Sequence, residues 1–287
     1  MNKQVKRTFI LGEEWLYYKI YCGNYSADNI LSETILPIVK KLHKKKLIKK
    51  WFFIRYNDPK NHLRLRFQIN DTKNIQKIIF LIQAHFRELI EKDLVNDIVT
   101  ATYKREIERY GETTIELIEK LFYYQSKKVL KLICNTTKQN DEIARIFASI
   151  LMIDEMLEQF KMSFNDRISF VKSMEQAYKA EHEIEKENNK KLDQLYRAYK
   201  NEIELYLQEK QEPLYLQGLI KLFKTTKKEI AIINDIIEGK PSIPIESLIS
   251  PIIHMNINRI FRSKQRQYEM LCYDFMTRYY KSIAARK

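Results

Sequence analysis

The chain has 287 residues, of which 45% are hydrophobic and 12% aromatic, so it is long enough to bury a sizeable core. Five glycines and six prolines leave few turn signals, which favours long helices over a sandwich or barrel of many short strands. A net charge of +14 and a pI near 9.4 point to an acidic partner such as nucleic acid, but a composition rich in Lys, Asn and Ile gives the same balance without functional meaning.

Cysteine usage and hydropathy exclude two classes of protein. Cys22, Cys134 and Cys272 are far apart, so the sequence has neither a disulfide framework nor a CxxC pair, which fits a reducing compartment. The N-terminal residues contain no apolar run of signal-peptide length, and no later stretch approaches 18 apolar residues. We therefore expect a soluble cytoplasmic protein without membrane insertion.

The first predicted elements alternate between strand and helix. Aromatic and β-branched runs indicate strands, and a periodicity of three to four residues indicates helices. In chain order we expect a strand at 15–21, a helix at 29–46 capped by Ser26 or Asp28, strands at 51–56 and 62–69 joined by a turn at 57–61, a helix at 75–94, and a strand at 98–103. This order is the split βαβ plan of a ferredoxin-like sheet.

The pattern becomes purely helical after Gly111. Apolar residues recur three and four positions apart, and no Pro interrupts the first four segments. We expect helices at 113–133, 141–161, 168–211 and 213–238, a break at 239–244, and a final helix from 245 or 251 to 284. The part at 176–211 is so polar that we expect it to project into solvent as a helix or a helical hairpin. The predicted fold is α+β and predominantly helical, with an α/β subdomain at 1–111 and a helical subdomain at 112–287 that together form one catalytic unit.

A lysine-rich run at 40–50 interleaves seven lysines with apolar residues at helical spacing. Lysines near a helix C-terminus interact favourably with the helix dipole, so we interpret the run as a solvated helix end. Contact with RNA or an acidic peptide is the alternative interpretation.

The most informative segment is His62-Leu63-Arg64-Leu65-Arg66-Phe67. Side chains alternate faces along a strand, so one face carries the three apolar residues and the other carries His62, Arg64 and Arg66. Two arginines about 6 to 7 Å apart on a rigid strand suit a ligand with one or two carboxylates or phosphates. A solvated charged sheet face is the alternative that the hexapeptide alone leaves open.

His254 is the second candidate site residue. It lies in an apolar stretch that contains a polar cluster, and in a helix it shares a face with Asn258 one turn later. A histidine in such a setting is more often a packed core residue than a catalyst. Metal sites, phosphate loops and dinucleotide motifs are not expected, because the sequence has no HExxH, no CxxC pair and only isolated glycines.

Several segments in a fixed order resemble a known family. The first is the aromatic strand and turn at 51–59. It is followed by His62-Leu63-Arg64-Leu65-Arg66-Phe67, Arg105-Glu106-Ile107-Glu108-Arg109-Tyr110-Gly111 and His254-Met255-Asn256-Ile257-Asn258-Arg259, and Glu269 lies beyond these segments. Together they look like the C-terminal domain of class I lantibiotic dehydratases, which also occurs alone as the thiopeptide-type bacteriocin biosynthesis protein. The resemblance covers residues 15–282.

In that family the domain removes glutamate from glutamylated Ser or Thr side chains of a precursor peptide, which leaves dehydroalanine or dehydrobutyrine. The matching positions here are Arg64, Arg66, Arg109 and His254. The resemblance therefore implies a carbon–oxygen lyase that eliminates glutamate and uses no cofactor.

The chemistry of a glutamyl ester agrees with these residue types. Its free γ-carboxylate and its departing α-carboxylate are two anions that arginines can bind and stabilise. Abstraction of the α-proton of Ser or Thr needs a base of near-neutral pKa, for which His254 is the best candidate. The expected catalytic residues are His254, Arg109 and Arg66; the expected glutamate-binding residues are Arg64, Arg66, Arg109 and His62; the expected supporting residues are Glu106, Asn258, Arg259 and Tyr110.

The resemblance also implies partners. A precursor peptide is the substrate, and a separate tRNA-dependent glutamylation protein supplies the ester, because the chain lacks the large glutamylation domain of full-length dehydratases. A cyclase is a further candidate partner, whereas direct binding of nucleic acid is not expected. The chain departs from its relatives at Gln125-Ser126, where they often have Asp-Ser, which puts the role of that Asp in doubt.

Two other functions remain open from the sequence. Stand-alone versions of this domain also include pyridine-forming [4+2] cycloaddition enzymes that act on dehydrated peptides, a reaction that needs no glutamate-binding arginines. The other alternative is a non-catalytic module that binds precursor peptide or tRNA, which the lysine run and the net charge motivate.

Overall fold

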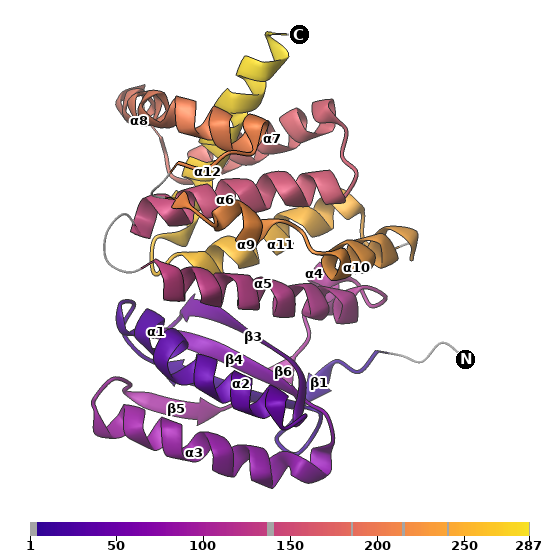
Figure 1. Ribbon diagram of the computed structural model, residues 1–287. Coiled ribbons are helices and arrows are strands. Elements are labelled where there is room, and N and C mark those ends of the chain that lie inside the picture. The colour runs from indigo at the N-terminus through magenta and orange to yellow at the C-terminus, as the bar shows by residue number, and fades with distance from the viewer. Residues whose placement is uncertain (1–4, 137–140, 185, 214–215, 240, 287) are drawn as a thin grey trace. The chain divides into compact units, whose positions relative to one another are not determined.

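The computed structural model describes residues 5–136, 141–184, 186–213, 216–239 and 241–286 (Figure 1). The chain forms two compact units. The first comprises residues 1–135 and 235–263, and the second comprises residues 136–234 and 264–287. This division differs from the boundary after residue 111 expected from the sequence, because α5 (Ile115–Asn135) and α11 (Ile245–Ile260) belong to the unit that contains the sheet.

A four-stranded antiparallel sheet organises the first unit. Its strands are β2 (Trp15–Tyr21), β3 (Ile48–Asn57), β4 (Asn61–Ile69) and β5 (Asp97–Thr100), in the spatial order β3-β4-β2-β5. All three neighbouring pairs are antiparallel. The predicted strands are thus present, and β2 has the predicted bounds. The classification of the sheet as ferredoxin-like stays a prediction.

The sequence did not predict the short two-stranded sheet formed by β1 (Thr8–Phe9) and β6 (Tyr103–Lys104). The strand expected at 98–103 ends at Thr100, and Tyr103 begins the new strand. The Tyr103 ring stacks on Phe9 at 5.9 Å and meets Trp15 edge-on at 5.1 Å. This packing places Tyr103 on the face of the sheet that carries Arg66.

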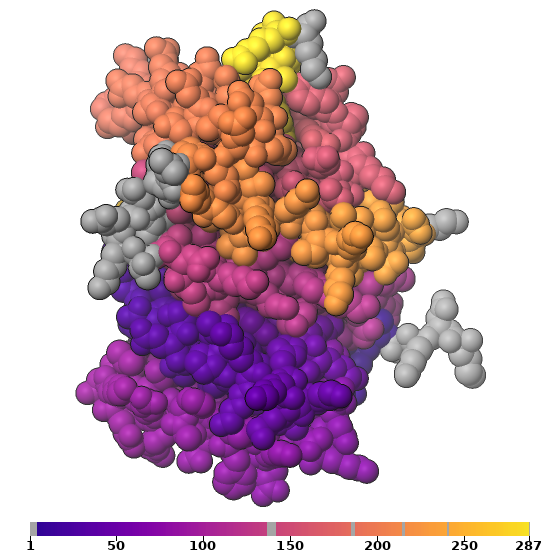
Figure 2. Space-filling view, viewed as in Figure 1, coloured from indigo at the N-terminus to yellow at the C-terminus, as the bar shows by residue number. Residues whose placement is uncertain are grey.

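Helices cover the opposite, apolar face of the sheet. In Figure 1, α2 (Leu36–Lys44) and α3 (Ile75–Glu91) lie along it, and the surface they form is indigo and purple in Figure 2. Leu63, Leu65 and Phe67 are all buried, as the alternation in β4 predicts, and Tyr18 of β2 packs edge-on against Phe86 of α3. The remaining short helices of this unit are α1 (Ser26–Asn29), the π-helix η1 (Ile30–Ile35), the 3-10 helix η2 (Thr72–Asn74) and α4 (Ile107–Tyr110).

The helix expected at 29–46 is thus divided into α1, η1 and α2, with Pro37 in the first turn of α2. A proline has no N–H to donate, so the first turn of a helix is where it is best tolerated. The sequence pattern predicted the continuous apolar face but not the change of hydrogen-bond spacing within it.

Side chains satisfy the outer edge of β3, which is the last strand in the order β3-β4-β2-β5 of the described sheet. The Phe53 N–H donates to the Ser126 hydroxyl at 3.3 Å, and the Arg259 Nε donates to the Phe53 carbonyl at 2.8 Å. The Arg55 N–H donates to Asn258 Oδ1 at 2.9 Å. Unpaired backbone groups on an edge strand are costly when buried, so these bonds attach α5 and α11 to the sheet.

A buried carboxylate connects α5 to the face of the sheet that carries Arg66 and Tyr103. Glu119 is fully buried, and its oxygens accept hydrogen bonds from Arg105 Nε (2.8 Å) and Nη2 (2.9 Å), from Lys50 Nζ (3.0 Å) and from the Tyr103 hydroxyl (2.8 Å). Burial lowers the pKa of Lys50, and Glu119 opposes that effect. The expectation of a solvated lysine run is therefore wrong for Lys50, which lies inside β3, whereas its neighbour Lys49 is exposed.

The second unit is helical in the described residues. Its helices are α6 (Asp141–Gln159), α7 (Phe164–Glu181), α8 (Lys186–Glu204), the π-helix η3 (Leu205–Glu209), α9 (Leu219–Phe223), most of α10 (Lys227–Glu238) and α12 (Gln265–Ala284). Residues 185, 214, 215 and 240, which belong to predicted segments, lie outside the described residues.

Two helix predictions are wrong in their bounds, and a third is wrong in part. The region at 168–211 forms two main helices, α7 and α8, which agrees with the hairpin alternative. The expected projection into solvent is wrong for α7, because Tyr178 packs on Tyr273 at 5.7 Å and Lys179 pairs with Asp274 of α12. The helix expected at 213–238 is divided into α9 and α10. The final helix is divided between α11 and α12, where Phe261 is extended and Lys264 has a φ of 54°.

We expect Glu119→Gln to lower the free energy of unfolding by about 3 to 5 kcal/mol, because Arg105 and Lys50 would remain buried without their anion. Glu116→Gln is the matched control: its side chain is 60% exposed, and its pairing with Arg105 is expected to contribute less than about 1 kcal/mol. Urea unfolding measures both values. Equal losses for the two variants would contradict the assignment.

Candidate active site

Strand β4 places the predicted cations on one face, as its alternation requires. Arg66 is 7% exposed, and its guanidinium carbon lies 4.4 Å from the ring centre of Tyr17, 4.9 Å from that of Tyr103 and 5.3 Å from that of Phe52. Register explains two of these neighbours, because Tyr17 on β2 and Phe52 on β3 are the Cα partners of Arg66. The Arg66 side chain is therefore held in an aromatic box rather than on a solvated surface.

The Arg66 guanidinium retains hydrogen-bonding capacity inside this box. Its Nε and Nη1 atoms are buried, and no acceptor among the described residues reaches either of them. Buried N–H groups on a cation favour an anionic acceptor, because desolvation strengthens the interaction. Arg66 thus has the properties of an anion-binding residue.

Arg64 and His62 form the second part of the cationic face. The Arg64 guanidinium carbon lies 3.3 Å from the Tyr56 ring centre, and Arg64 Nε donates to His62 Nε2 at 3.2 Å. His62 Nδ1 lies 2.8 Å from the Lys60 carbonyl oxygen, so the neutral tautomer with its proton on Nδ1 satisfies both contacts. Burial lowers the pKa of His62, and the Arg64 charge acts in the same direction. His62 therefore orients Arg64 and has no nitrogen left to act as a base.

Helix α11 carries the predicted base. His254 is half-buried and lies one turn before Asn258, whose side chain binds the β3 backbone at Arg55. Residues four apart share a helix face, so the bond at Asn258 fixes the orientation of the face that carries His254. The predicted pairing of His254 and Asn258 on one helical face agrees with the observed α11.

Arg259, predicted as a supporting residue, is fully buried at the end of the same helix. Its Nε binds the Phe53 carbonyl, and its Nη1 donates to the Met255 carbonyl at 3.0 Å and to Asn256 Oδ1 at 3.2 Å. Its guanidinium carbon lies 4.5 Å from the Phe122 ring centre. The Nη2 atom is buried without an acceptor in the part of the chain that the structure describes.

The segment after β6 supplies Glu106, Arg109 and Tyr110. Arg109 Nη1 pairs with Glu106 Oε2 at 3.0 Å, and both side chains are about half exposed. Tyr110 is buried and meets Phe122 edge-on at 5.5 Å. Burial raises the pKa of Tyr110 to about 12, so its hydroxyl stays protonated.

Aromatic contacts bring Arg66, Arg259 and Tyr110 together. Phe52, which contacts Arg66, packs on Phe122 at 5.6 Å, and Phe122 in turn contacts both Arg259 and Tyr110. Burial lowers the pKa of Arg259 to about 9; Tyr110 opposes this shift, and the Arg66 charge adds to it. The arginines from β4 and α11 thus interact electrostatically, whereas Arg109 forms its own, more exposed pair with Glu106.

Sequence reasoning missed most of the aromatic residues that surround Arg66. The signal was present in the strand alternation, because Tyr17 on β2 and Phe52 on β3 share the face of Arg66 once the register is known. Phe122 is one residue on an amphipathic helix and gave no such signal. Gln125, which departs from the pattern of the relatives, is buried, and no described donor forms a hydrogen bond to its Oε1.

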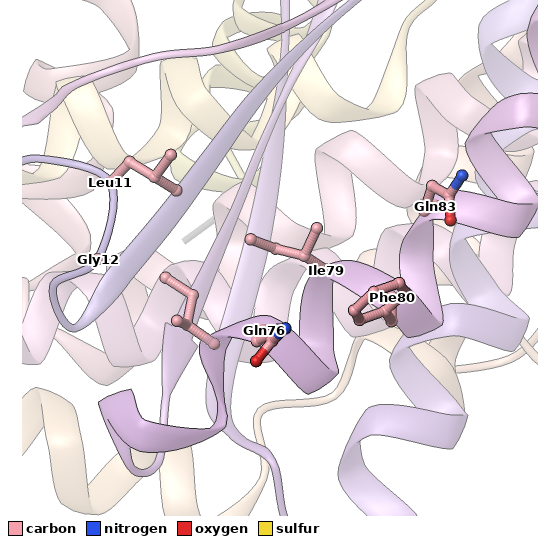
Figure 3. A pocket seen from close by; sticks show the side chains of 7 residues that line it. Leu11, Gly12, Gln76, Ile79, Phe80 and Gln83 are labelled. Atoms are coloured by element: carbon pink, nitrogen blue, oxygen red, sulfur yellow. The ribbon is translucent and has the colours of Figure 1, made fainter.

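A surface groove beside α3 contains none of the predicted site residues. A groove of about 520 Å³ is lined by Leu11, Gly12 and side chains of α3 such as Ile79 and Phe80 (Figure 3). Within the described residues, no group of three or more His, Cys, Asp or Glu side chains is arranged to hold a metal ion. No described helix combines the length and apolar character needed to cross a bilayer.

Comparison with known proteins gives a consistent result. The chain is 28% identical over 253 residues to the subtilin biosynthesis protein SpaB of Bacillus subtilis, an alignment that covers 87% of this chain and 24% of SpaB. The chain thus spans about a quarter of the length of that relative. Its fold is similar to the tRNA-dependent lantibiotic dehydratase MibB from Microbispora sp. 107891, with a TM-score of 0.71, 18% identity, and coverage of 97% of this chain and 29% of MibB.

A second solved structure matches along its whole length. The pyridine synthase TbtD from thiomuracin biosynthesis has a TM-score of 0.63 and 10% identity, and the match covers 96% of this chain and 100% of TbtD. At these identities the structural matches show the fold alone. The family profile described as "Lantibiotic biosynthesis dehydratase C-term" matches residues 15–280, so the chain belongs to the family of lantibiotic dehydratase C-terminal domains.

Proposed function

We propose that this protein eliminates glutamate from glutamylated Ser or Thr residues of a ribosomally made precursor peptide, which yields dehydroalanine or dehydrobutyrine. The observation that supports the proposal best is Arg66, a buried cation in an aromatic box with two N–H groups that have no acceptor among the described residues. Family membership supports dehydratase chemistry on such peptides in general terms. The assignment to elimination rests on the match of Arg64, Arg66, Arg109 and His254 to the elimination residues.

The proposed substrate is an ester between the Ser side-chain oxygen and the α-carboxyl group of glutamate. Its γ-carboxylate is an anion before the reaction, and its α-carboxylate becomes an anion as the ester bond breaks. Arg64, held on Tyr56 and oriented by His62, and Arg66 supply two forked donors from one strand face. Such preorganised donors can bind the γ-carboxylate and stabilise the negative charge that develops on the α-carboxylate, without reorganisation during the reaction.

In the proposed elimination, His254 removes the α-proton of the modified residue. The electron pair of that C–H bond forms the Cα–Cβ double bond, the Cβ–O bond breaks, and glutamate departs with its α-carboxylate stabilised by arginine. Arg109 is proposed to approach the leaving group after exchanging Glu106 for substrate, because both side chains are about half exposed. The proton on His254 then returns to solvent, so the reaction needs no cofactor or oxidant.

The proposed partners follow from the substrate. The ester is proposed to come from a separate tRNA-dependent glutamylating activity, and the dehydrated product is a suitable substrate for a cyclase, because dehydroalanine and dehydrobutyrine accept thiols. The precursor peptide is the macromolecule that the proposed active site binds.

We expect Arg66→Gln to reduce kcat/KM for elimination from a glutamylated Ser peptide by at least about tenfold, the value of one charge-assisted hydrogen bond to a substrate carboxylate. Mass spectrometry of the peptide, without tRNA, measures the loss of glutamate and the formation of the dehydro residue. Arg87→Gln is the matched control, because Arg87 is exposed on α3 and is expected to leave the rate unchanged. An unaltered peptide with wild-type protein would contradict the proposed function.

We expect His254→Gln to reduce kcat by about 100- to 10,000-fold, the range for loss of a general base, with a smaller change in KM. His85→Gln serves as control, since His85 lies half-buried on α3 outside the proposed site. Single-turnover rates on the same peptide separate chemistry from binding. If both variants retain the wild-type rate, His254 is not the base.

The second candidate function is pyridine formation by [4+2] cycloaddition on a dehydrated peptide. The match that covers the whole of the pyridine synthase TbtD favours it, since that protein is similar in size to this chain. A cycloaddition has no leaving glutamate, so the buried Arg66 would have no anion to bind. Offering an already dehydrated peptide tests this function, and a cyclised product that still forms with Arg66→Gln would favour it over elimination.

A further inference from the structure

Hydrogen bonds hold the Arg259 guanidinium in place, yet one of its nitrogen atoms has no acceptor among the described residues. Three acceptors on two elements hold its Nε and Nη1, namely the carbonyls of Phe53 and Met255 and the side chain of Asn256. Its Nη2 is buried, and within the described chain nothing accepts from it. A structural role alone would be expected to use the whole guanidinium, because a buried unsatisfied donor costs about 1 to 3 kcal/mol.

Arg259 and Arg66 are linked through shared neighbours on β3 and α5. Phe52 contacts Arg66 and packs on Phe122, against which Arg259 lies, and Arg259 binds the carbonyl of Phe53, the next residue along β3. Both guanidinium groups are buried, and the Arg66 charge adds to the effect of burial in lowering the pKa of Arg259. Like charges in a buried site are unfavourable without a counter-charge.

No described carboxylate accepts a hydrogen bond from the spare nitrogens of Arg66 or Arg259. Glu119, the buried carboxylate nearby, already accepts from Tyr103, Arg105 and Lys50. Gln125 follows Phe122 by three positions on α5, so it lies on the same side of the helix, and it is buried and uncharged. An anionic ligand can supply the counter-charge that the described residues do not give to these nitrogens.

We propose that Arg259 and Arg66 together bind the γ-carboxylate of the substrate glutamyl group, with Gln125 as the neutral residue that leaves the pair available to it. The choice of the γ-carboxylate rests on the proposed function. That group is charged both before and after elimination, so it offsets the buried pair throughout the reaction, whereas the α-carboxylate gains its charge only as the ester bond breaks. Arg64 and Arg109, which are more exposed, remain for the α-carboxylate.

This assignment predicts an effect on binding rather than on the chemical step. Gln125→Glu adds a carboxylate on the side of α5 that carries Phe122, the neighbour of Arg259, and it changes none of the residues that hydrogen-bond Arg259, so it is less disruptive than replacing Arg259. We expect it to weaken binding of L-glutamate, the reaction product, by at least about tenfold, the value of one charge-assisted hydrogen bond. KM for the glutamylated peptide is expected to rise by a similar factor, with kcat nearly unchanged.

Isothermal titration of the full chain with L-glutamate measures the binding directly, and thermal unfolding confirms that each variant is folded. Gln83→Glu on the exposed surface of α3 is the matched control for an added negative charge and is expected to leave the affinity unchanged. Arg259→Lys is the second variant: it keeps the charge but loses the fork, and it is also expected to weaken binding by about tenfold.

The outcomes separate this inference from the function it rests on. If L-glutamate fails to bind the unaltered protein, or if folded Gln125→Glu and Arg259→Lys bind it as well as wild type, the inference is overturned. A fall in kcat without a change in KM would also overturn it, because that result assigns the pair to the leaving group. If the variants weaken glutamate binding but the wild-type protein leaves the glutamylated peptide intact, the binding site is supported and elimination is not.

Discussion

The outer edge of β3 is the feature on which the candidate site depends. An edge strand that is covered must have its N–H and carbonyl groups satisfied, and here Ser126, Asn258 and Arg259 do so with side chains rather than with another strand. Because hydrogen bonds are directional, the bonds from Asn258 and Arg259 both attach α11 to the sheet and fix its position along β3. The same bonds therefore bring Arg259 to the aromatic residues Phe52 and Phe122 that connect it to Arg66, although the two arginines are far apart in the sequence.

Much of the sheet was predictable, because its information is local. The aromatic and β-branched run at 15–21 predicted β2 with its observed bounds, and the alternation in β4 predicted which side chains are buried. The helix boundaries that failed depend on distant partners. No Gly or Pro marks the break between α11 and α12; there the Arg262 side chain instead pairs with Asp28, far away in the sequence. Lys50 reads as part of a solvated run until Glu119 of α5 is placed beside it.

The candidate site was predictable to a similar extent. Arg64 and Arg66 on one strand face follow from the period of a strand, and the resemblance marked Arg109 and His254. What the sequence does not contain is the environment of each cation, since it depends on register and helix packing. Tyr17, Phe52 and Phe122 make Arg66 and Arg259 buried, interacting charges, whereas Arg109 remains half exposed beside Glu106. The sequence alone therefore does not distinguish the buried arginines, Arg66 and Arg259, from the half-exposed Arg109.

The unit that contains the sheet is discontinuous, since it combines residues 1–135 with residues 235–263. During synthesis, β3 and β4 leave the ribosome long before α11, so the outer edge of β3 and the aromatic box around Arg66 exist for a time without Arg259 and Asn258. Contacts between distant parts of a chain form slowly, and an uncovered edge strand is prone to pair with other chains. The arrangement that completes the proposed anion site therefore also makes its assembly one of the last steps in folding, and aggregation of unfinished chains is the hazard that accompanies it.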